Sequence, residues 1–104
     1  VLTEPYYTLA LVHQHQGRID EAIQAMKKVV YLNRGSILGH YGLANLYYSQ
    51  RKLPKAIKSL DNAWRLLSEH ANDELVPNSD GITFGNLRQA ITQQQQRWNA
   101  EATH

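Results

Sequence analysis

The feature that most constrains this chain is an internal repeat of 34 residues. Over the pairs from Pro5/Gly39 to Asn33/Leu67, shifting the sequence by that distance produces seven identities, against roughly two expected from ordinary composition. The identical pairs are Tyr7/Tyr41, Leu9/Leu43, Ala10/Ala44, Gln16/Gln50, Ala22/Ala56, Ile23/Ile57 and Leu32/Leu66. A period of this length is typical of stacked helix–turn–helix units. Such units form extended surfaces that hold other polypeptides more often than they carry out chemistry.

Apolar spacing predicts two pairs of helices, over about residues 4–16 and 19–32, then 37–50 and 53–67. In the first helix, Tyr6, Leu9, Ala10 and His13 recur at the i, i+3, i+4 and i+7 positions of one helix face. Thr3 and Ser36 are suitable N-caps for the first helix of each pair. The two glycines of the third helix are expected where neighbouring helix backbones approach closely.

The fourth helix is expected to bury one face. Its members are Leu53, Ala56, Ile57, Leu60, Ala63, Trp64 and Leu67. After it, residues 68–82 break the period, and their Asn-Asp, Pro-Asn and Ser-Asp-Gly segments predict a loop. A last helix is expected to start after Thr83, with Phe84, Leu87, Ile91 and Trp98 on the face that closes the stack.

The expected fold class is therefore all-α, with two helix–turn–helix repeats, a loop and a C-terminal capping helix. Residues 1–104 are interpreted as a single domain. Its parts are repeat one at about 3–34, repeat two at about 36–68, the loop at 69–82 and the capping helix at 83–99. The start at Val1, with neither an initiator Met nor a signal pattern, is interpreted as a cut from a longer protein.

Composition excludes several classes of function. The chain has no cysteine, so disulfides and cysteine-based metal sites are excluded. No apolar run approaches the roughly 18 residues that cross a bilayer, and we expect a cytoplasmic protein without membrane insertion. The net charge is only +2 and the basic residues cluster loosely, at Lys27-Lys28 and Arg51-Lys52. A nucleic-acid partner is therefore not expected.

No constellation of residues predicts catalysis or a metal. His13 and His15 stand at i and i+2, which point to different faces of a helix. The acidic residues and histidine of segment 69–74 are interpreted as a solvated loop cluster. Phosphate-binding loops, nucleophile elbows and zinc helices are missing from the sequence. We expect this chain to be non-catalytic and to hold no cofactor.

Small residues recur where two helices of a unit would cross, at Ala10 and Ala22 and at their repeat partners Ala44 and Ala56. Large residues stand between them, Leu9 and Leu43 in the first helices, Met26 and Leu60 in the second. This pattern resembles the tetratricopeptide repeat. Arg34 and Ser68 stand where that pattern ends in proline, and Arg51 replaces the turn glycine found at Gly17.

Two segments resemble a narrower group. One runs from Tyr31-Leu32-Asn33 through His40 to Leu43-Ala44-Asn45-Leu46-Tyr47, and the other from Trp64-Arg65-Leu66-Leu67 to Val76–Thr83. Together they are similar to the C-terminal repeat module of bacterial chemotaxis-type (CheR-like) protein glutamate methyltransferases. The resemblance implies an accessory module that selects or regulates partners, with an S-adenosylmethionine-dependent catalytic domain elsewhere in the parent protein. The implied partners are a chemoreceptor cytoplasmic region, a signalling regulator or the parent's own catalytic domain.

The repeat resemblance also implies a concave groove lined by the first helix of each pair. Its predicted partner-binding residues are Tyr7, Leu11, Gln14 and His15 from repeat one and Leu38, Tyr41, Asn45 and Tyr48 from repeat two. Tyrosines suit an interface because each combines a broad apolar ring with a hydroxyl. The alternative is that Tyr41 and Tyr48 pack against the last helix or a neighbouring domain.

The chemistry of these positions favours one class of ligand. Tyr7 and Tyr41 stand where repeats that clamp a C-terminal carboxylate need lysine, so a carboxylate clamp is not expected. A helix or an extended segment docking by shape is expected instead. Two functions stay open, a partner-selecting module of a receptor methyltransferase and a generic repeat scaffold of an unrelated multidomain protein.

Overall fold

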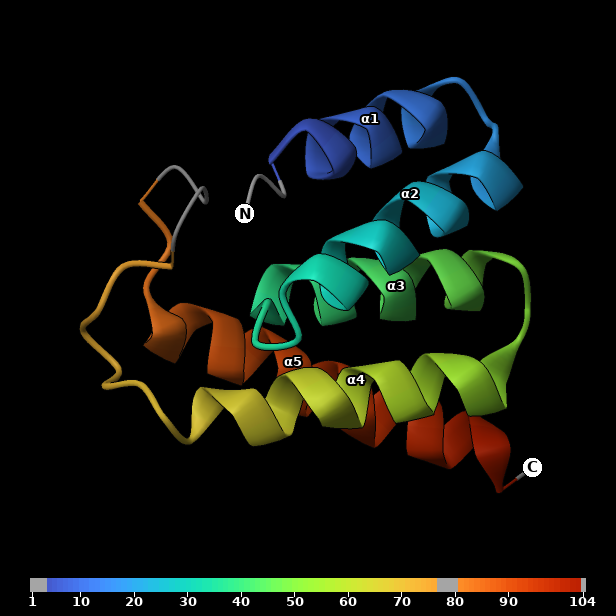
Figure 1. Cartoon of the computed structure of the whole chain (residues 1–104). Coiled ribbons are helices and arrows are strands. Elements are labelled where there is room, and N and C mark those ends of the chain that lie inside the picture. Colours follow the sequence, from blue (N-terminus) through green and yellow to red (C-terminus); the bar gives the residue numbers. More distant parts are fainter. Residues whose placement is uncertain (1–3, 77–80, 104) are drawn as a thin grey trace.

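The computed structural model describes residues 4–76 and 81–103, and five helices make up its architecture (Figure 1). They are α1 (Glu4–His15), α2 (Ile19–Leu32), α3 (Ile37–Ser49), α4 (Leu53–Leu67) and α5 (Phe84–Ala102). The all-α repeat fold expected from the sequence is confirmed. The expected N-cap at Thr3 and the turn residues Pro77 to Asp80 lie outside the described residues.

The two helix pairs end their first helix with the same turn. The N–H of Arg18 donates to the carbonyl of His13 at 2.8 Å, and that of Lys52 donates to Tyr47 at 3.0 Å. Both turns need a left-handed residue, which is Gly17 at φ 75° and Arg51 at φ 60°. The missing glycine of repeat two therefore changes the residue but leaves the backbone geometry of the turn intact.

α2 and α3 pack closely because two glycines lie between them. A Cβ on Gly39 would fall 2.8 Å from Cγ1 of Val30, and one on Gly42 would fall 2.6 Å from Cε of Met26. Both distances are shorter than real side chains allow, so the space above each glycine is already filled by α2. This is the close helix approach that the sequence predicts for the third helix.

One continuous apolar core runs through all five helices. Its small members include Ala10, Ala22, Ala44 and Ala56, each with no exposed surface. α5 closes the open side of α4 with Phe84, Leu87, Ile91 and Trp98, all buried as expected. Thr83 caps α5, since its hydroxyl accepts the Asn86 N–H at 3.1 Å. Ser36 caps α3 in the same way through the Gly39 N–H.

The exposure of two apolar side chains departs from the expected burial. Leu9, an apolar counterpart of Leu43, is 45% exposed because none of the helices in the described residues lies against this face of α1. Trp64 was expected on the buried face of α4 but is 39% exposed, since its large indole lies at the edge of that face. Two glutamines of α5 form hydrogen bonds with the preceding helices, because Gln94 donates to Asn45 of α3 and Gln95 donates to Asp61 of α4.

The repeat register can be tested by truncating the same leucine in both units. Leu43 is 5% exposed, so Leu43→Ala is expected to lower the free energy of unfolding by about 2–5 kcal/mol. Leu9→Ala is the matched control and is expected to cost less than about 1 kcal/mol, as surface changes do. Urea unfolding followed by circular dichroism measures both; equal losses would contradict the packing described here.

The lowered pKa of His40 is expected to make the stability of the protein depend on pH. Burial lowers its pKa, against the smaller opposing effect of its hydrogen bond with the Arg34 carbonyl. The unfolded chain thus binds this proton more readily, and stability falls as the pH drops below about 6.5. We expect His40→Gln to reduce the loss of stability between pH 7.5 and 5.5, measured by urea unfolding. An unchanged pH slope, or the same change in the exposed-histidine control His15→Gln, would contradict this.

Candidate partner-binding surface

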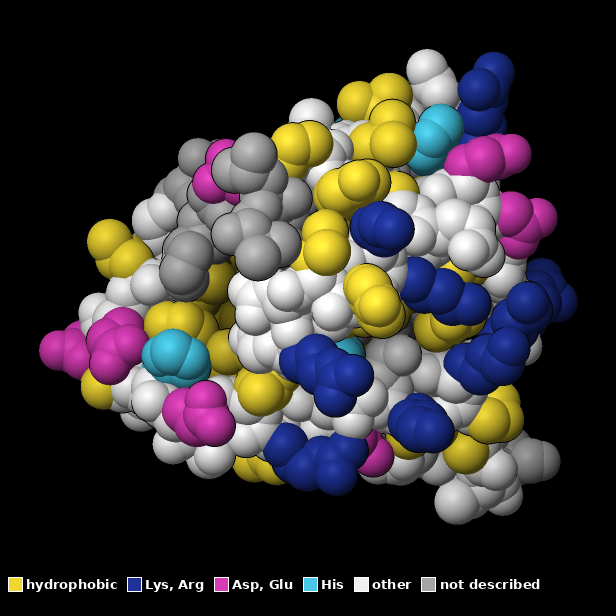
Figure 2. All heavy atoms as spheres, viewed as in Figure 1, with side chains coloured by type: hydrophobic (Ala, Val, Ile, Leu, Met, Phe, Trp, Pro, Cys, Tyr) yellow, Lys and Arg dark blue, Asp and Glu magenta, His cyan; other side chains and the backbone are white. Residues whose placement is uncertain are grey.

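Charge is divided unevenly between the helices. α1 and α3 contain no lysine or arginine, and Glu4 is their only carboxylate. The basic side chains belong to α2, α4, the turns and α5. Figure 2 shows lysine and arginine gathered over α2 and α4, with acidic side chains at the end of the molecule that carries the loop after α4. The first helices of the two pairs therefore offer a nearly uncharged surface.

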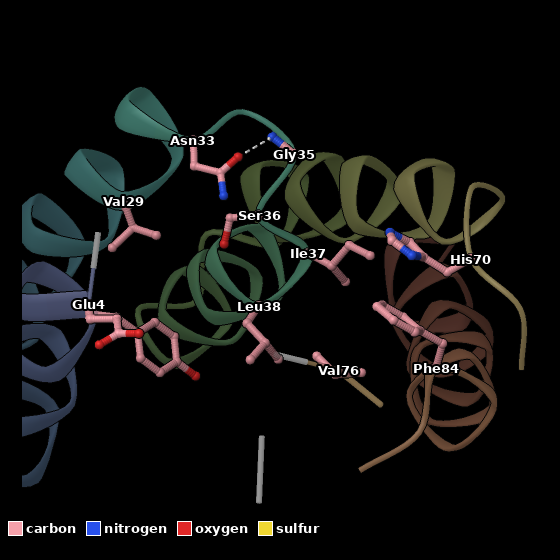
Figure 3. Close-up of a pocket in the computed structure, with 11 residues that line it drawn as sticks. Glu4, Val29, Asn33, Gly35, Ser36, Ile37, Leu38, His70, Val76 and Phe84 are labelled. Carbon is pink, nitrogen blue, oxygen red and sulfur yellow. Dashed lines mark hydrogen bonds between the residues drawn. The ribbon is translucent and has the colours of Figure 1, made fainter. Parts of the chain in front are cut away.

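A pocket opens where α1, α3 and the loop before α5 meet (Figure 3). Its volume is about 190 Å³. It is lined by Glu4, Tyr7, Val29, Asn33, Gly35, Ser36, Ile37, Leu38, His70, Val76 and Phe84. Two of the eight predicted groove residues, Tyr7 and Leu38, thus come together here from different repeats. We call this space the α1–α3 pocket.

The lining of the α1–α3 pocket suits a side chain with an apolar body. Ile37, Leu38 and Val76 form apolar wall, while Asn33 and Ser36 add polar groups at the turn before α3. Burial raises the pKa of Tyr7, so its phenol stays neutral and can both donate and accept a hydrogen bond. The pocket can hold a protruding side chain.

The loop supplies the far wall through a stacked pair of rings. His70 lies parallel to Phe84, with ring centroids 4.0 Å apart and planes at 5°. The ring Nδ1 of His70 lies 3.1 Å from Oε2 of Glu74 and donates a hydrogen bond to it. This hydrogen bond is the largest of the effects that lower the pKa of Glu74. Arg88 holds the chain before the loop by donating to the Leu67 carbonyl at 2.7 Å. His70 thus forms part of the wall, while Glu69, Asp73 and Glu74 are exposed, as the sequence predicted for this cluster.

The C-terminal half of α3 is engaged by α5. Tyr48 stacks on Trp98 with ring centroids 4.7 Å apart, and its hydroxyl donates to Oε1 of Glu101 at 2.7 Å. That hydrogen bond is the main reason that the pKa of Tyr48 is raised. Asn45 donates to the Tyr41 carbonyl and accepts from Gln94 of α5. For Tyr48, these contacts correspond to the alternative in which it packs against the last helix, although it keeps 37% of its surface exposed.

The remaining predicted residues lie on accessible parts of the first helices. Leu11, Gln14 and His15 are exposed along α1, and Tyr41 is half-buried in α3. The structure thus distributes the eight residues among a pocket, an exposed helix face and a contact with α5. Their role in binding stays a prediction.

Several residues that line the pocket were not predicted as binding residues from the sequence. His70, Val76 and Phe84 come from the loop and the start of α5, which have no counterpart in the repeat period. Asn33 and Ser36 belong to the turn between the repeats, where only capping was expected. The one available signal was the length of the connection between α4 and α5, because long loops in compact domains commonly have a structural or functional role.

The described residues were also considered as a metal site and as a membrane span. Within residues 4–76 and 81–103, no three histidine, aspartate or glutamate side chains are placed to hold a metal ion. In the same part of the chain, no helix is long and apolar enough to span a membrane.

Comparison with known proteins identifies one repeat directly. Residues 3–36 match the tetratricopeptide repeat family, which covers α1, α2 and the turn that follows. No curated protein matches the chain. Tetratricopeptide repeats generally mediate binding between proteins and are typically non-catalytic. The first 34-residue unit of this chain is therefore a tetratricopeptide repeat, within an all-α fold that repeats its helix pair once more.

Proposed function

We propose that this chain is a protein-binding module, and that the surface formed by α1 and α3, which includes the α1–α3 pocket, holds a helix or an extended segment of a partner. The observation that carries the proposal is the α1–α3 pocket, which opens on the helices that lack lysine and arginine. A partner that docks here meets apolar, aromatic and neutral polar groups with Glu4 as the carboxylate of the lining, so shape and aromatic contact supply most of the affinity.

The finer proposal concerns the parent protein. The segments Tyr31–Asn33, Leu43–Tyr47 and Val76–Thr83 are similar to the repeat module of chemotaxis-type protein glutamate methyltransferases. We propose that the chain is the accessory module of such an enzyme in the cytoplasm, where it selects or regulates partners in receptor methylation. The S-adenosylmethionine used in that reaction would be bound by the parent's catalytic domain.

Site-specific photo-crosslinking tests the binding surface. A benzophenone amino acid in place of Leu11, which is 38% exposed, is expected to crosslink a defined partner polypeptide in the cells that make the protein. The matched control places the same probe at Gln89, an exposed residue of α5. Identical crosslinking patterns at both positions, or none at Leu11 with the fold intact by circular dichroism, would contradict the proposal.

The parent assignment has a separate test, which is to read the gene upstream of the codon for Val1. A catalytic domain with a glycine-rich S-adenosylmethionine loop is expected there. If it is present, Leu11→Lys in the whole protein is expected to change receptor methylation, whereas Gln89→Lys leaves it unchanged. A different upstream domain would overturn the methyltransferase assignment and leave a generic protein-binding repeat module.

A further inference from the structure

The first helix exposes a stripe of residues that has a buried counterpart elsewhere in the fold. The stripe consists of Pro5, Thr8, Leu9 and Val12, spaced i, i+3, i+4 and i+7 along α1, and we call it the N-terminal stripe. All four residues are exposed, Leu9 by 45% and Val12 by 44%. Figure 2 shows apolar side chains gathered over α1 on this end of the molecule.

The counterpart lies 34 residues later on α3 and is covered by α2. It consists of Gly39, Gly42, Leu43 and Leu46. Leu43 is 5% exposed and Leu46 only 1%. The two glycines of this set touch α2, so all four positions face that helix. The contrast between the two stripes arises because α2 lies against α3, whereas no helix of residues 4–76 and 81–103 lies against the same face of α1.

The α2–α3 interface also contains a side-chain hydrogen bond, and the equivalent residue at the end of α1 is exposed. Nε2 of Gln50 donates to Oδ1 of Asp20, in the first turn of α2, at 2.6 Å. Gln16 is the equivalent of Gln50 and is exposed. A helix that lay on the N-terminal stripe as α2 lies on α3 would bring a first-turn carboxylate to Gln16.

We propose that the N-terminal stripe is a second docking surface, which binds one amphipathic helix of a partner polypeptide in the way α2 binds α3. The inference is independent of the α1–α3 pocket, because Leu9 and Val12 lie outside that pocket and are not among the predicted groove residues. The repeat of the chain itself supplies the geometry of the bound helix.

The stripe also restricts the sequence of that helix. Pro5 and Thr8 stand where α3 has glycines, so their side chains fill the space into which α2 inserts Val30 and Met26. The partner helix therefore needs residues smaller than valine and methionine at those two positions. Like α2, the partner helix has apolar residues along the rest of its contact face and an acidic residue in its first turn.

The surroundings of the stripe favour a separate partner over a permanently packed helix. Because Pro5 and Thr8 replace the two glycines, a helix with side chains as large as Val30 and Met26 cannot approach α1 as closely as α2 approaches α3. The edge is polar and aromatic, since Nζ of Lys28 lies 5.9 Å from the ring centroids of Tyr6 and Tyr31, and Tyr31 is 72% exposed. An apolar centre with a polar rim is the usual anatomy of a reversible interface.

Three synthetic peptides test this inference by titration into the ¹⁵N-labelled protein. The first has the sequence of residues 18–33, and the second adds Met26→Ala and Val30→Ala. The third is the control for the helix-promoting effect of alanine, with Gln24→Ala and Lys28→Ala on the polar face. The second peptide is expected to bind about tenfold more tightly than the other two, with amide shifts centred on Leu9 and Val12.

Protein variants locate the contact. Leu9→Lys is expected to abolish binding of the second peptide, whereas Leu11→Lys, the same charge change on the same helix, leaves it intact. Thr8→Gly removes the obstructing side chain and is expected to raise the affinity of the unmodified peptide about fivefold. Circular dichroism of each variant shows whether α1 stays folded.

Each contrary outcome overturns the inference. These outcomes are equal affinity of the three peptides, shifts centred on Leu38 and Tyr41, or no saturable shift up to about 1 mM peptide. Self-association in sedimentation velocity that Leu9→Lys abolishes would assign the stripe to a second copy of the chain. An upstream segment of the parent that covers the stripe would assign it to the same polypeptide.

Discussion

The close contact between α2 and α3 is the interaction on which the rest of the structure depends. A single helix pair cannot bury its apolar faces, so the two repeats are stable only when stacked. Gly39 and Gly42 allow this stacking at short range, because Val30 and Met26 of α2 occupy the space above them. The same contact sets the positions of α1 and α3, and hence of the uncharged surface between them.

The two ends of the stack differ in how much apolar surface they expose to solvent. At the C-terminal end, α5 buries four apolar residues against the core and adds hydrogen bonds from Gln94 and Gln95. At the N-terminal end, Leu9 and Val12 remain in contact with solvent. Because the equivalent residues of repeat two are buried against α2, the exposure of Leu9 and Val12 does not arise from a lack of apolar character. Within the described residues, α5 covers one end of the stack and no helix covers the other.

The capping helix also changes the candidate binding surface. In a regular repeat, Tyr48 and Asn45 would face the groove, but α5 takes up part of both side chains through Trp98, Glu101 and Gln94. The α1–α3 pocket lies instead toward the start of α3, where the loop closes it with His70 and Phe84. The loop thus has a structural part in a surface that the repeat pattern assigned to the helices alone.

Regularities of the sequence determined the helices, their caps and the stacking of the two units. The period of 34 residues places equivalent residues in equivalent environments, and apolar spacing identifies the buried faces because an α-helix has 3.6 residues per turn. This logic correctly predicted the cap at Thr83, the buried face of α5 and the reason for Gly39 and Gly42.

Only the tertiary structure decided which equivalent residues are buried and which are exposed. Leu9 and Leu43 are identical in the repeat pattern, yet their exposures differ because α2 covers Leu43 and no helix in the described part of the chain covers Leu9. The pairing of His70 with Phe84 and of Tyr48 with Trp98 joins segments that share no period. Such contacts depend on how the irregular connection after α4 folds back, and local spacing carries no information about that path.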